Sequence, residues 1–172
     1  MGRKINVKGS SGSGKTTFGR ELAERLDLPF VELDALHHGP NWTEATAEEF
    51  RAKVAPIVAE DAWVIDGNYE RKLGDLVLRE AETVVWLDLP LHMKLRRLWR
   101  RTLHRVRDDV ELWNGNKENW KSAFWGRDSL FYWAVRGHFR HRREFPRIVP
   151  AERLLRLRSP EEAERWLEAQ GS

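Results

Sequence analysis

The sequence predicts an α/β fold, in which helices cover both faces of a five-stranded parallel sheet as a three-layer α/β/α sandwich. Short apolar runs alternate with helical patterns along the chain, as expected for repeated strand–helix units. The first unit is the clearest: residues 5–7 indicate a buried strand, and Phe18, Leu22 and Leu26 follow at the spacing of one helix face. A glycine-rich loop, residues 9–16, joins the two.

This loop fits the motif G-x-x-x-x-G-K-[ST] at every fixed position. Glycines let a backbone approach a ligand closely, and loop N–H groups at a helix start attract an anion. Lys15 can reach the β- and γ-phosphates of a nucleotide, and the Thr16 hydroxyl can bind Mg²⁺. A merely flexible turn would not require the flanking strand and helix. The residues predicted to bind ATP here are Gly9, Ser10, Ser11, Gly12, Ser13, Gly14, Lys15, Thr16 and Thr17.

Length and composition indicate a single domain, residues 1–172, with enough apolar residues for a core. The chain is 41% hydrophobic and contains no cysteine, which excludes disulfides and thiolate metal sites. No apolar run reaches the length of a membrane span, and the first strand begins too early to leave room for a signal peptide. A cytoplasmic protein without membrane contact is therefore expected.

Positive charge is concentrated in one segment of the chain. The formal net charge is only +3, but residues 92–147 hold 15 Lys and Arg against 6 Asp and Glu. A basic segment in a nearly balanced protein implies a local anionic partner. Nucleotide phosphates and nucleic acid are the two candidates, and nucleic acid is the less favoured.

The rest of the chain continues the alternation of strands and helices. Further strands are predicted at residues 30–33, 63–65, 83–90 and 154–157. Helices are predicted at residues 46–60, 75–82, 129–144, from residue 91 and after Ser159. Thr46 and Glu49 form a capping-box pattern, and Ser159 stands as an N-cap before a proline. Pro146 and Pro150 are expected to end the helix that precedes them.

Acidic residues follow two of the predicted strands. Asp34 comes after the strand at 30–33, and Asp66 after the strand at 63–65. In a parallel sheet these strand ends face the ligand crevice. Asp34 could accept a proton from a substrate hydroxyl or help hold Mg²⁺, and Asp66 is predicted to support Mg²⁺ beside Thr16. Each could instead cap the following turn or helix. At least one of the adjacent His37 and His38 is expected to be a plain turn residue.

Arginines at helical spacing follow the fourth strand and recur near residue 140. Arg97 and Arg101 are i, i+4 neighbours, and we interpret them as phosphate clamps because guanidinium groups match phosphate oxygens. Arg136 and Arg140 are expected to join them. Residues 92–146 are predicted to be a helical lid that closes on ATP, with a rigid insert as the alternative. Its central aromatic residues could stack on a base, but most of them are expected to pack against the lid's own helices; they are Trp113, Trp120, Phe124 and Trp125.

The order of these motifs resembles adenylate kinase and its small-molecule kinase relatives. The resemblance rests on residues 9–16, on Asp66-Gly67, and on Leu87-Asp88-Leu89-Pro90 followed by Arg97 and Arg101. It implies a P-loop NTPase fold in which Arg97 and Arg101 act on the nucleotide from the lid. More narrowly, the segments 33–37 and 63–69 resemble the bacterial adenylate-kinase-like group often labelled topology modulation protein, or FlaR-like. That narrower resemblance covers nearly the whole chain.

The sequence departs from adenylate kinase where that enzyme receives AMP. Residues 34–38 are not of the Thr-Gly-Asp-Met-Leu-Arg type, and the third strand is not followed by Phe-Pro-Arg. An acidic residue directly after the second strand is closer to shikimate and gluconate kinases, where it meets a substrate hydroxyl. This departure favours a hydroxyl acceptor over a nucleoside monophosphate.

Together these features predict an ATP-dependent phosphotransferase acting on a small molecule, with ATP and Mg²⁺ as cofactors. The predicted catalytic residues are Lys15, Asp34, Arg97 and Arg101, and the predicted metal ligands are Thr16 and Asp66. The alternatives are a nucleotide-switched, nucleic-acid-binding regulator and a nucleoside monophosphate kinase. A monomer or a homodimer is expected.

Overall fold

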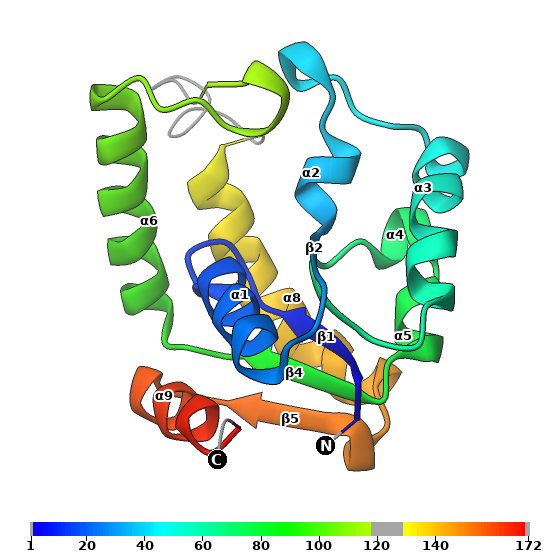
Figure 1. Ribbon diagram of the computed structural model, residues 1–172. Coiled ribbons are helices and arrows are strands. Elements are labelled where there is room, and N and C mark those ends of the chain that lie inside the picture. Colours follow the sequence, from blue (N-terminus) through cyan, green and yellow to red (C-terminus); the bar gives the residue numbers. More distant parts are fainter. Residues whose placement is uncertain (1, 118–128, 171–172) are drawn as a thin grey trace.

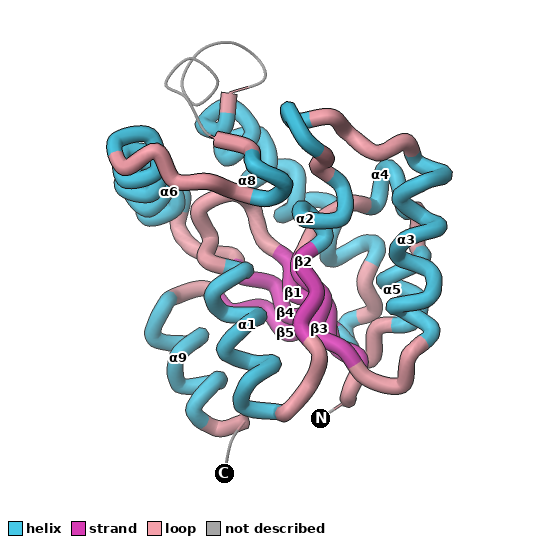
Figure 2. The backbone as a smooth tube through the Cα atoms, turned by 45° about the horizontal axis from the view of Figure 1, so that its top comes forward, coloured by secondary structure: helices cyan, strands magenta, loops and turns pink. Residues whose placement is uncertain are grey.

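The computed structural model describes residues 2–117 and 129–170. Its centre is a sheet of five strands in the order β2-β3-β1-β4-β5, and each neighbouring pair is parallel (Figures 1 and 2). The strands are β1 Lys4–Lys8, β2 Phe30–Glu32, β3 Trp63–Asp66, β4 Thr83–Leu87 and β5 Leu154–Leu157. The predicted fold class is confirmed.

Helices cover both faces of this sheet. The α-helices are α1 Lys15–Leu26, α2 Leu33–His37, α3 Ala47–Ala59, α4 Glu70–Leu73, α5 Leu76–Glu80, α6 Leu91–Arg107, α8 Leu130–Ile148 and α9 Pro160–Glu168. Short 3₁₀ helices are η1 Pro40–Trp42, η2 Trp113–Gly115 and η3 Ala151–Arg153. Figure 2 shows α1 and α9 on one side of the sheet and α3 to α5 on the other. None of the helices described is long and apolar enough to cross a membrane.

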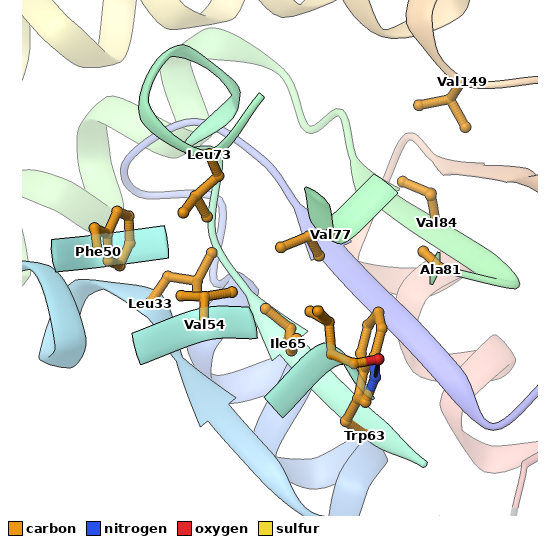
Figure 3. Packing of buried hydrophobic residues seen from close by; sticks show 11 residues of the cluster. Leu33, Phe50, Val54, Trp63, Ile65, Leu73, Val77, Ala81, Val84 and Val149 are labelled. Carbon is orange, nitrogen blue, oxygen red and sulfur yellow. Dashed lines mark hydrogen bonds between the residues drawn. The ribbon is translucent and has the colours of Figure 1, made fainter. Parts of the chain in front are cut away.

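Two apolar clusters, one on each face, form the core. Phe18, Leu22 and Leu167 pack beneath α1 and α9 against β1 and β4. On the other face, Phe50 and Val54 of α3 join residues of α4, α5 and β3 (Figure 3). The central strands β1 and β4 are buried on both faces, as in most parallel sheets, although one face of β1 carries the polar side chains Asn6 and Lys8. The core therefore fixes the strand ends at which the candidate site lies.

Some predicted boundaries are wrong, and the structure supplies the reasons. The second strand ends at Glu32 because Leu33 begins the short helix α2, so Asp34 lies in a helical turn and not at a strand end. One helix was predicted at residues 75–82, but the structure has two short helices here, α4 and α5. Gly74, with φ of 65°, lies between them. Helix α8 passes through Pro146 to Ile148, and its end is closed by a bond from the Val149 N–H to the Phe145 carbonyl (3.0 Å).

The capping box predicted at Thr46 is confirmed. Its side-chain oxygen accepts a hydrogen bond from the Glu49 N–H (3.2 Å), and Glu49 accepts one from the Thr46 N–H (2.9 Å). Ser159 likewise caps α9, by accepting from the Glu162 N–H (3.2 Å). Both caps are local patterns, which explains why the sequence alone could predict them.

Thr46→Ala is expected to lower the free energy of unfolding by about 1 kcal/mol, because the first turn of α3 loses an acceptor for its free N–H groups. Thermal unfolding followed by circular dichroism measures the change, and Thr46→Ser is the control because it keeps the hydroxyl. Equal melting temperatures for Thr46→Ala and the wild type would show that the cap does not stabilise α3.

Helices α6 and α8 flank the end of the sheet that carries residues 9–16, where a lid is predicted. They contact each other, and Trp99 of α6 lies edge-on to Phe131 of α8. The predicted aromatic residues Trp120, Phe124 and Trp125 lie outside the described residues. Closure of residues 92–146 on ATP stays a prediction.

Candidate active site

Residues 9–14 connect β1 to α1 in a conformation that depends on glycine. Gly12 has φ of 80° and Gly14 has φ of 87°, values that side chains oppose. The Ser13 N–H donates to the Ser10 carbonyl (3.0 Å) and so closes the turn. Gly14 is the N-cap of α1, and no side chain caps the N–H groups of the helix there. These groups are therefore available to an anion such as a phosphate chain.

Asn68 holds the start of this loop. Its side-chain oxygen accepts from the Gly9 N–H (3.2 Å), and its amide donates to the Gly9 carbonyl (2.6 Å). The residue follows β3, which pairs with β1, so the bond joins neighbouring strand ends. The sequence analysis did not single it out. Its position two residues after Asp66 was the available signal.

Lys15, Thr16 and Asp66 meet at the first turn of α1. The Thr16 hydroxyl donates to Asp66 Oδ2 (2.5 Å), and Lys15 Nζ lies 3.8 Å from Asp66 Oδ1. Burial raises the pKa of Asp66, against the opposing effects of Lys15 and Thr16. Burial alone would lower the pKa of Lys15, but Asp66 and Asp34 together raise it, so Lys15 stays cationic. The structure thus brings the predicted nucleotide and metal residues together.

These residues fit a magnesium ion. Asp66 Oδ1 is buried without a hydrogen-bond partner, and the Thr16 hydroxyl oxygen lies beside the same carboxylate. Among residues 2–117 and 129–170, no three His, Asp or Glu side chains form a complete metal site. Mg²⁺ commonly takes one or two protein oxygens and completes its shell with water and phosphate oxygens. Thr16 and Asp66 match that requirement.

Glu32 is a further carboxylate at this position that the sequence analysis missed. It is the last residue of β2 and lies opposite Asp66 in the register of the sheet. Its Oε1 lies 3.5 Å from the Thr16 hydroxyl. Burial raises the pKa of Glu32, and a hydrogen bond from the side chain of Trp113 opposes that rise. Trp113 comes from the segment after α6, so that segment reaches the floor of the site.

Asp34 lies in the first turn of α2, where Tyr69 orients it. The Tyr69 hydroxyl donates to Asp34 Oδ1 (2.5 Å), and burial together with Asp34 raises the pKa of Tyr69. The carboxylate of Asp34 is close enough to Lys15 and Asp66 to affect the pKa of both. Among the described residues, no hydrogen bond reaches its second oxygen, Oδ2. Tyr69 follows Asp66 by three residues, a spacing that the sequence analysis did not interpret.

The two adjacent histidines have different surroundings. His37 is buried against Phe50 and Tyr69, and burial and the nearby Lys72 lower its pKa. It is thus a neutral packing residue. His38 stacks on Trp113, with ring centroids 6.2 Å apart. At least one of the pair was expected to be a plain turn residue, but His37 is instead the buried last residue of α2.

A cavity of about 640 Å³ adjoins the loop on the side of α6 and α9. Arg97 and Arg101 line it together with Arg105, which extends the same i, i+4 row and was not predicted. Arg97 Nη1 also donates to the Ser13 carbonyl (3.3 Å). Loop residues Gly12–Thr17 and Pro160 and Ala163 of α9 complete much of the wall. A nucleotide bound on the loop would lie between α1, α6 and α9.

The predicted clamps on α8 do not line this cavity. Arg136 donates to the Tyr132 hydroxyl (2.9 Å), and Arg140 Nε lies 3.3 Å from a carboxylate oxygen of Glu144. In the structure, both arginines contact residues of their own helix. A role for Arg136 and Arg140 in ATP binding stays a prediction that requires α8 or these side chains to move.

Comparisons with known proteins agree with this geometry. Residues 11–55 match the family model for shikimate kinase. A shikimate kinase from Symbiobacterium thermophilum is 36% identical over 115 residues, which cover 59% of this chain and 66% of the relative. One from Sulfurihydrogenibium is 30% identical over 110 residues, covering 56% of this chain and 66% of that relative. The chain thus spans just under two thirds of these relatives.

Solved structures of kinases share nearly the whole fold. A shikimate kinase from Acinetobacter baumannii in complex with shikimate superposes with a TM-score of 0.63 at 17% identity, over 98% of this chain and 90% of the other. A gluconokinase from Sinorhizobium meliloti gives a TM-score of 0.56 at 21% identity, over 99% and 95%. The chain has the fold of the P-loop kinases. The narrower resemblance to the topology modulation group stays a prediction.

Within the P-loop kinase fold, Asp66→Asn is expected to raise the Mg²⁺ concentration needed for ATP binding about tenfold, because an amide replaces an anionic ligand. Calorimetric titration of ATP at several Mg²⁺ concentrations measures the shift. Asp61→Asn on the exposed loop before β3 is the control. An unchanged Mg²⁺ dependence in Asp66→Asn would contradict the metal role.

Proposed function

We propose that this protein is an ATP-dependent phosphotransferase that moves the γ-phosphoryl group of ATP to a hydroxyl of a small molecule. The observation that carries the proposal is the placement of Asp34 beside the loop. A carboxylate held by Tyr69 lies close enough to raise the pKa of Lys15, which is the residue expected at the γ-phosphate. This arrangement supports a site in which Asp34 would face an acceptor bound beside the γ-phosphate of ATP.

The phosphate loop would bind and orient the ATP phosphates through the N–H groups at the start of α1. Lys15 would bridge the β- and γ-phosphates, and Arg97 and Arg101 would add positive charge from α6. These fixed cations would stabilise the charge of the transferring group without reorganisation. Bound Mg²⁺, held by Thr16 and Asp66, would neutralise the phosphates further.

Asp34 would act on the acceptor. Its carboxylate would accept the hydroxyl proton as the acceptor oxygen bonds to the γ-phosphorus and the bond to the leaving ADP oxygen breaks. The hydrogen bond from Tyr69 occupies one oxygen and leaves the other for the acceptor. Trp113, whose side chain hydrogen-bonds to Glu32, would help exclude water that competes as an acceptor.

The charge of the site suggests the class of acceptor. Burial raises the pKa values of Glu32 and Asp66, and the nearby carboxylates add to that rise, Asp34 for both and Asp66 for Glu32. An acceptor with its own carboxylate or phosphate would be repelled unless a cation compensated it. We therefore rank neutral and amine-bearing polyols above acids. The matched relatives nevertheless make shikimate a compound that must be tested.

The nucleic-acid alternative is less well supported. The main argument for it is the basic segment 92–147. In the structure, however, Arg97 and Arg101 line the cavity beside the loop, and Arg142 donates a hydrogen bond to Asp88. These three arginines therefore line the cavity or bind a buried carboxylate of the protein itself. A nucleic-acid binder would lose affinity steeply with added salt. A gel-shift titration at two salt concentrations separates the two classes.

An ATP-consumption screen tests the proposal. The panel contains nucleosides, nucleoside monophosphates, neutral sugars, aminoglycosides, gluconate and shikimate, with Mg²⁺ present throughout. Stimulation by a neutral or amine-bearing polyol is expected, and Lys15→Ala serves as the inactive control. Stimulation by monophosphates alone would support a nucleoside monophosphate kinase instead. Stimulation by shikimate alone would contradict the ranking of acceptors but not the phosphotransferase.

A further inference from the structure

A buried ionic cluster lies behind the phosphate loop, outside the site described above. Asp88 follows the end of β4, and its side chain is only 1% exposed. Arg142 Nε of α8 donates to both of its oxygens (3.0 and 3.1 Å), and Arg156 of β5 donates to Oδ2 from Nε (3.1 Å) and Nη2 (2.6 Å). The ammonium of Lys94, on α6, lies 3.9 Å from Oδ1. One carboxylate thus connects three elements of the fold.

A second contact joins the same two helices. Lys94 Nζ lies 3.1 Å from Nδ1 of His138 on α8, and both side chains are buried. Burial lowers the pKa of Lys94 to about 8 and also lowers the pKa of His138. At neutral pH a cationic Lys94 therefore donates to a neutral His138. Helices α6 and α8 are held together at the level of Asp88.

Both helices also touch the phosphate loop. The Lys94 carbonyl is so close to Gly12 that a Cβ there would lie 2.3 Å from its oxygen. One turn further along α6, Arg97 donates to the Ser13 carbonyl. On α8, a Cβ built at Gly137 would lie 3.3 Å from the Cβ of Ser10. The loop is therefore packed between two helices that each place a cation beside Asp88.

We propose that Asp88 is a positioning residue for ATP binding, because it fixes α6 and α8 against the phosphate loop. It does not contact the loop itself, and acts through Lys94 and Arg142. The inference rests on the proposed function only in placing the ATP phosphates on this loop. Loss of the α8 contact would let Ser10 and its neighbours shift, and loss of the α6 contact would move Arg97. Small displacements of such groups weaken preorganised binding strongly.

The three cations around Asp88 provide a matched test. Arg142 and Arg156 each donate two hydrogen bonds to Asp88, and both side chains are partly exposed, at 43% and 32%. Of these two arginines, Arg142 lies on α8, which touches the loop, whereas Arg156 lies on β5. Arg142→Met is expected to weaken ATP-Mg²⁺ binding about fivefold to tenfold, while Arg156→Met stays within about twofold of the wild type. Arg142→Lys should recover part of the affinity.

Isothermal calorimetry with ATP-Mg²⁺ measures these affinities, and melting temperatures are recorded for each variant. Val54→Ala, in the apolar cluster on the α3 side, shows what loss of stability alone does to binding. Asp88→Asn is a further variant, expected to bind at least as weakly as Arg142→Met if it folds.

The expected result is weaker binding by Arg142→Met but not by Val54→Ala or Arg156→Met. Equal affinity of Arg142→Met and the wild type would overturn the positioning role, as would equal losses in Arg142→Met and Arg156→Met. If the wild type itself failed to bind ATP-Mg²⁺, the proposed function would fail, and the positioning role with it.

Discussion

Lys15→Ala is expected to lower the rate of phosphoryl transfer by about 10³-fold, because the cation nearest the transferring group is removed. The side chain of Lys15 is 17% exposed and contributes to neither apolar cluster, so the fold should survive the change. ATP affinity should also fall, since Lys15 is predicted to bridge the β- and γ-phosphates. Initial rates with the acceptor found in the screen, together with ATP calorimetry, measure both effects.

The control for this variant is Lys53→Ala on α3. Within the described part of the chain, Lys53 donates to the Leu36 carbonyl, away from the loop, and its loss should leave turnover within about twofold. Melting curves of both variants verify that each is folded. Turnover and ATP affinity equal to wild type in a folded Lys15→Ala would remove the basis for placing the phosphates on residues 9–16.

Asp34→Asn is expected to lower kcat by about 10²- to 10⁴-fold with little change in ATP affinity, because the acceptor hydroxyl loses its base. The amide can still accept the hydrogen bond from Tyr69, so the change tests charge more than packing. Steady-state kinetics at saturating ATP separate kcat from the KM for the acceptor. Tyr69→Phe should have a smaller effect, since it frees Asp34 without removing it.

Asp61→Asn is the control for this second variant, because it removes an exposed carboxylate outside the site. Should Asp34→Asn retain full turnover on the identified acceptor, Asp34 would be neither base nor orienting group. Glu32, whose Oε1 lies 3.5 Å from the Thr16 hydroxyl, would then be the next carboxylate to replace.

Features determined by local sequence could be predicted well. The loop at 9–16, the capping box at Thr46 and the N-cap at Ser159 each depend on residues within a few positions of one another. Strand positions followed from short apolar runs, because both faces of a parallel sheet are buried. The strand–helix alternation was then enough to predict the fold class.

Features determined by strand order could not be predicted in the same way. Asn68 holds Gly9 because β3 lies beside β1, and Glu32 reaches Thr16 because β2 pairs with β3. The local sequence pattern does not reveal which strands pair with each other. Tyr69 orients Asp34 across 35 positions of sequence. The residues missed were therefore the partners of the residues found.

The buried charges show the same limit. Lys94 lies in a basic run and looks like any solvated lysine in the sequence, yet the fold buries it beside Asp88 and His138. Only the packing of α6 against α8 and the end of β4 reveals its partners. Pro146 is a similar case, since α8 continues through it although a proline usually ends a helix.

The most direct test of the central claim is phosphorus NMR of the protein incubated with ATP-Mg²⁺ and the active acceptor from the screen. The account predicts loss of the γ-phosphate signal of ATP, formation of ADP and a new phosphate monoester resonance, none of which should appear with Lys15→Ala. Release of inorganic phosphate without any monoester, by a wild-type protein that binds ATP, would contradict the claim that this site transfers a phosphoryl group to a hydroxyl.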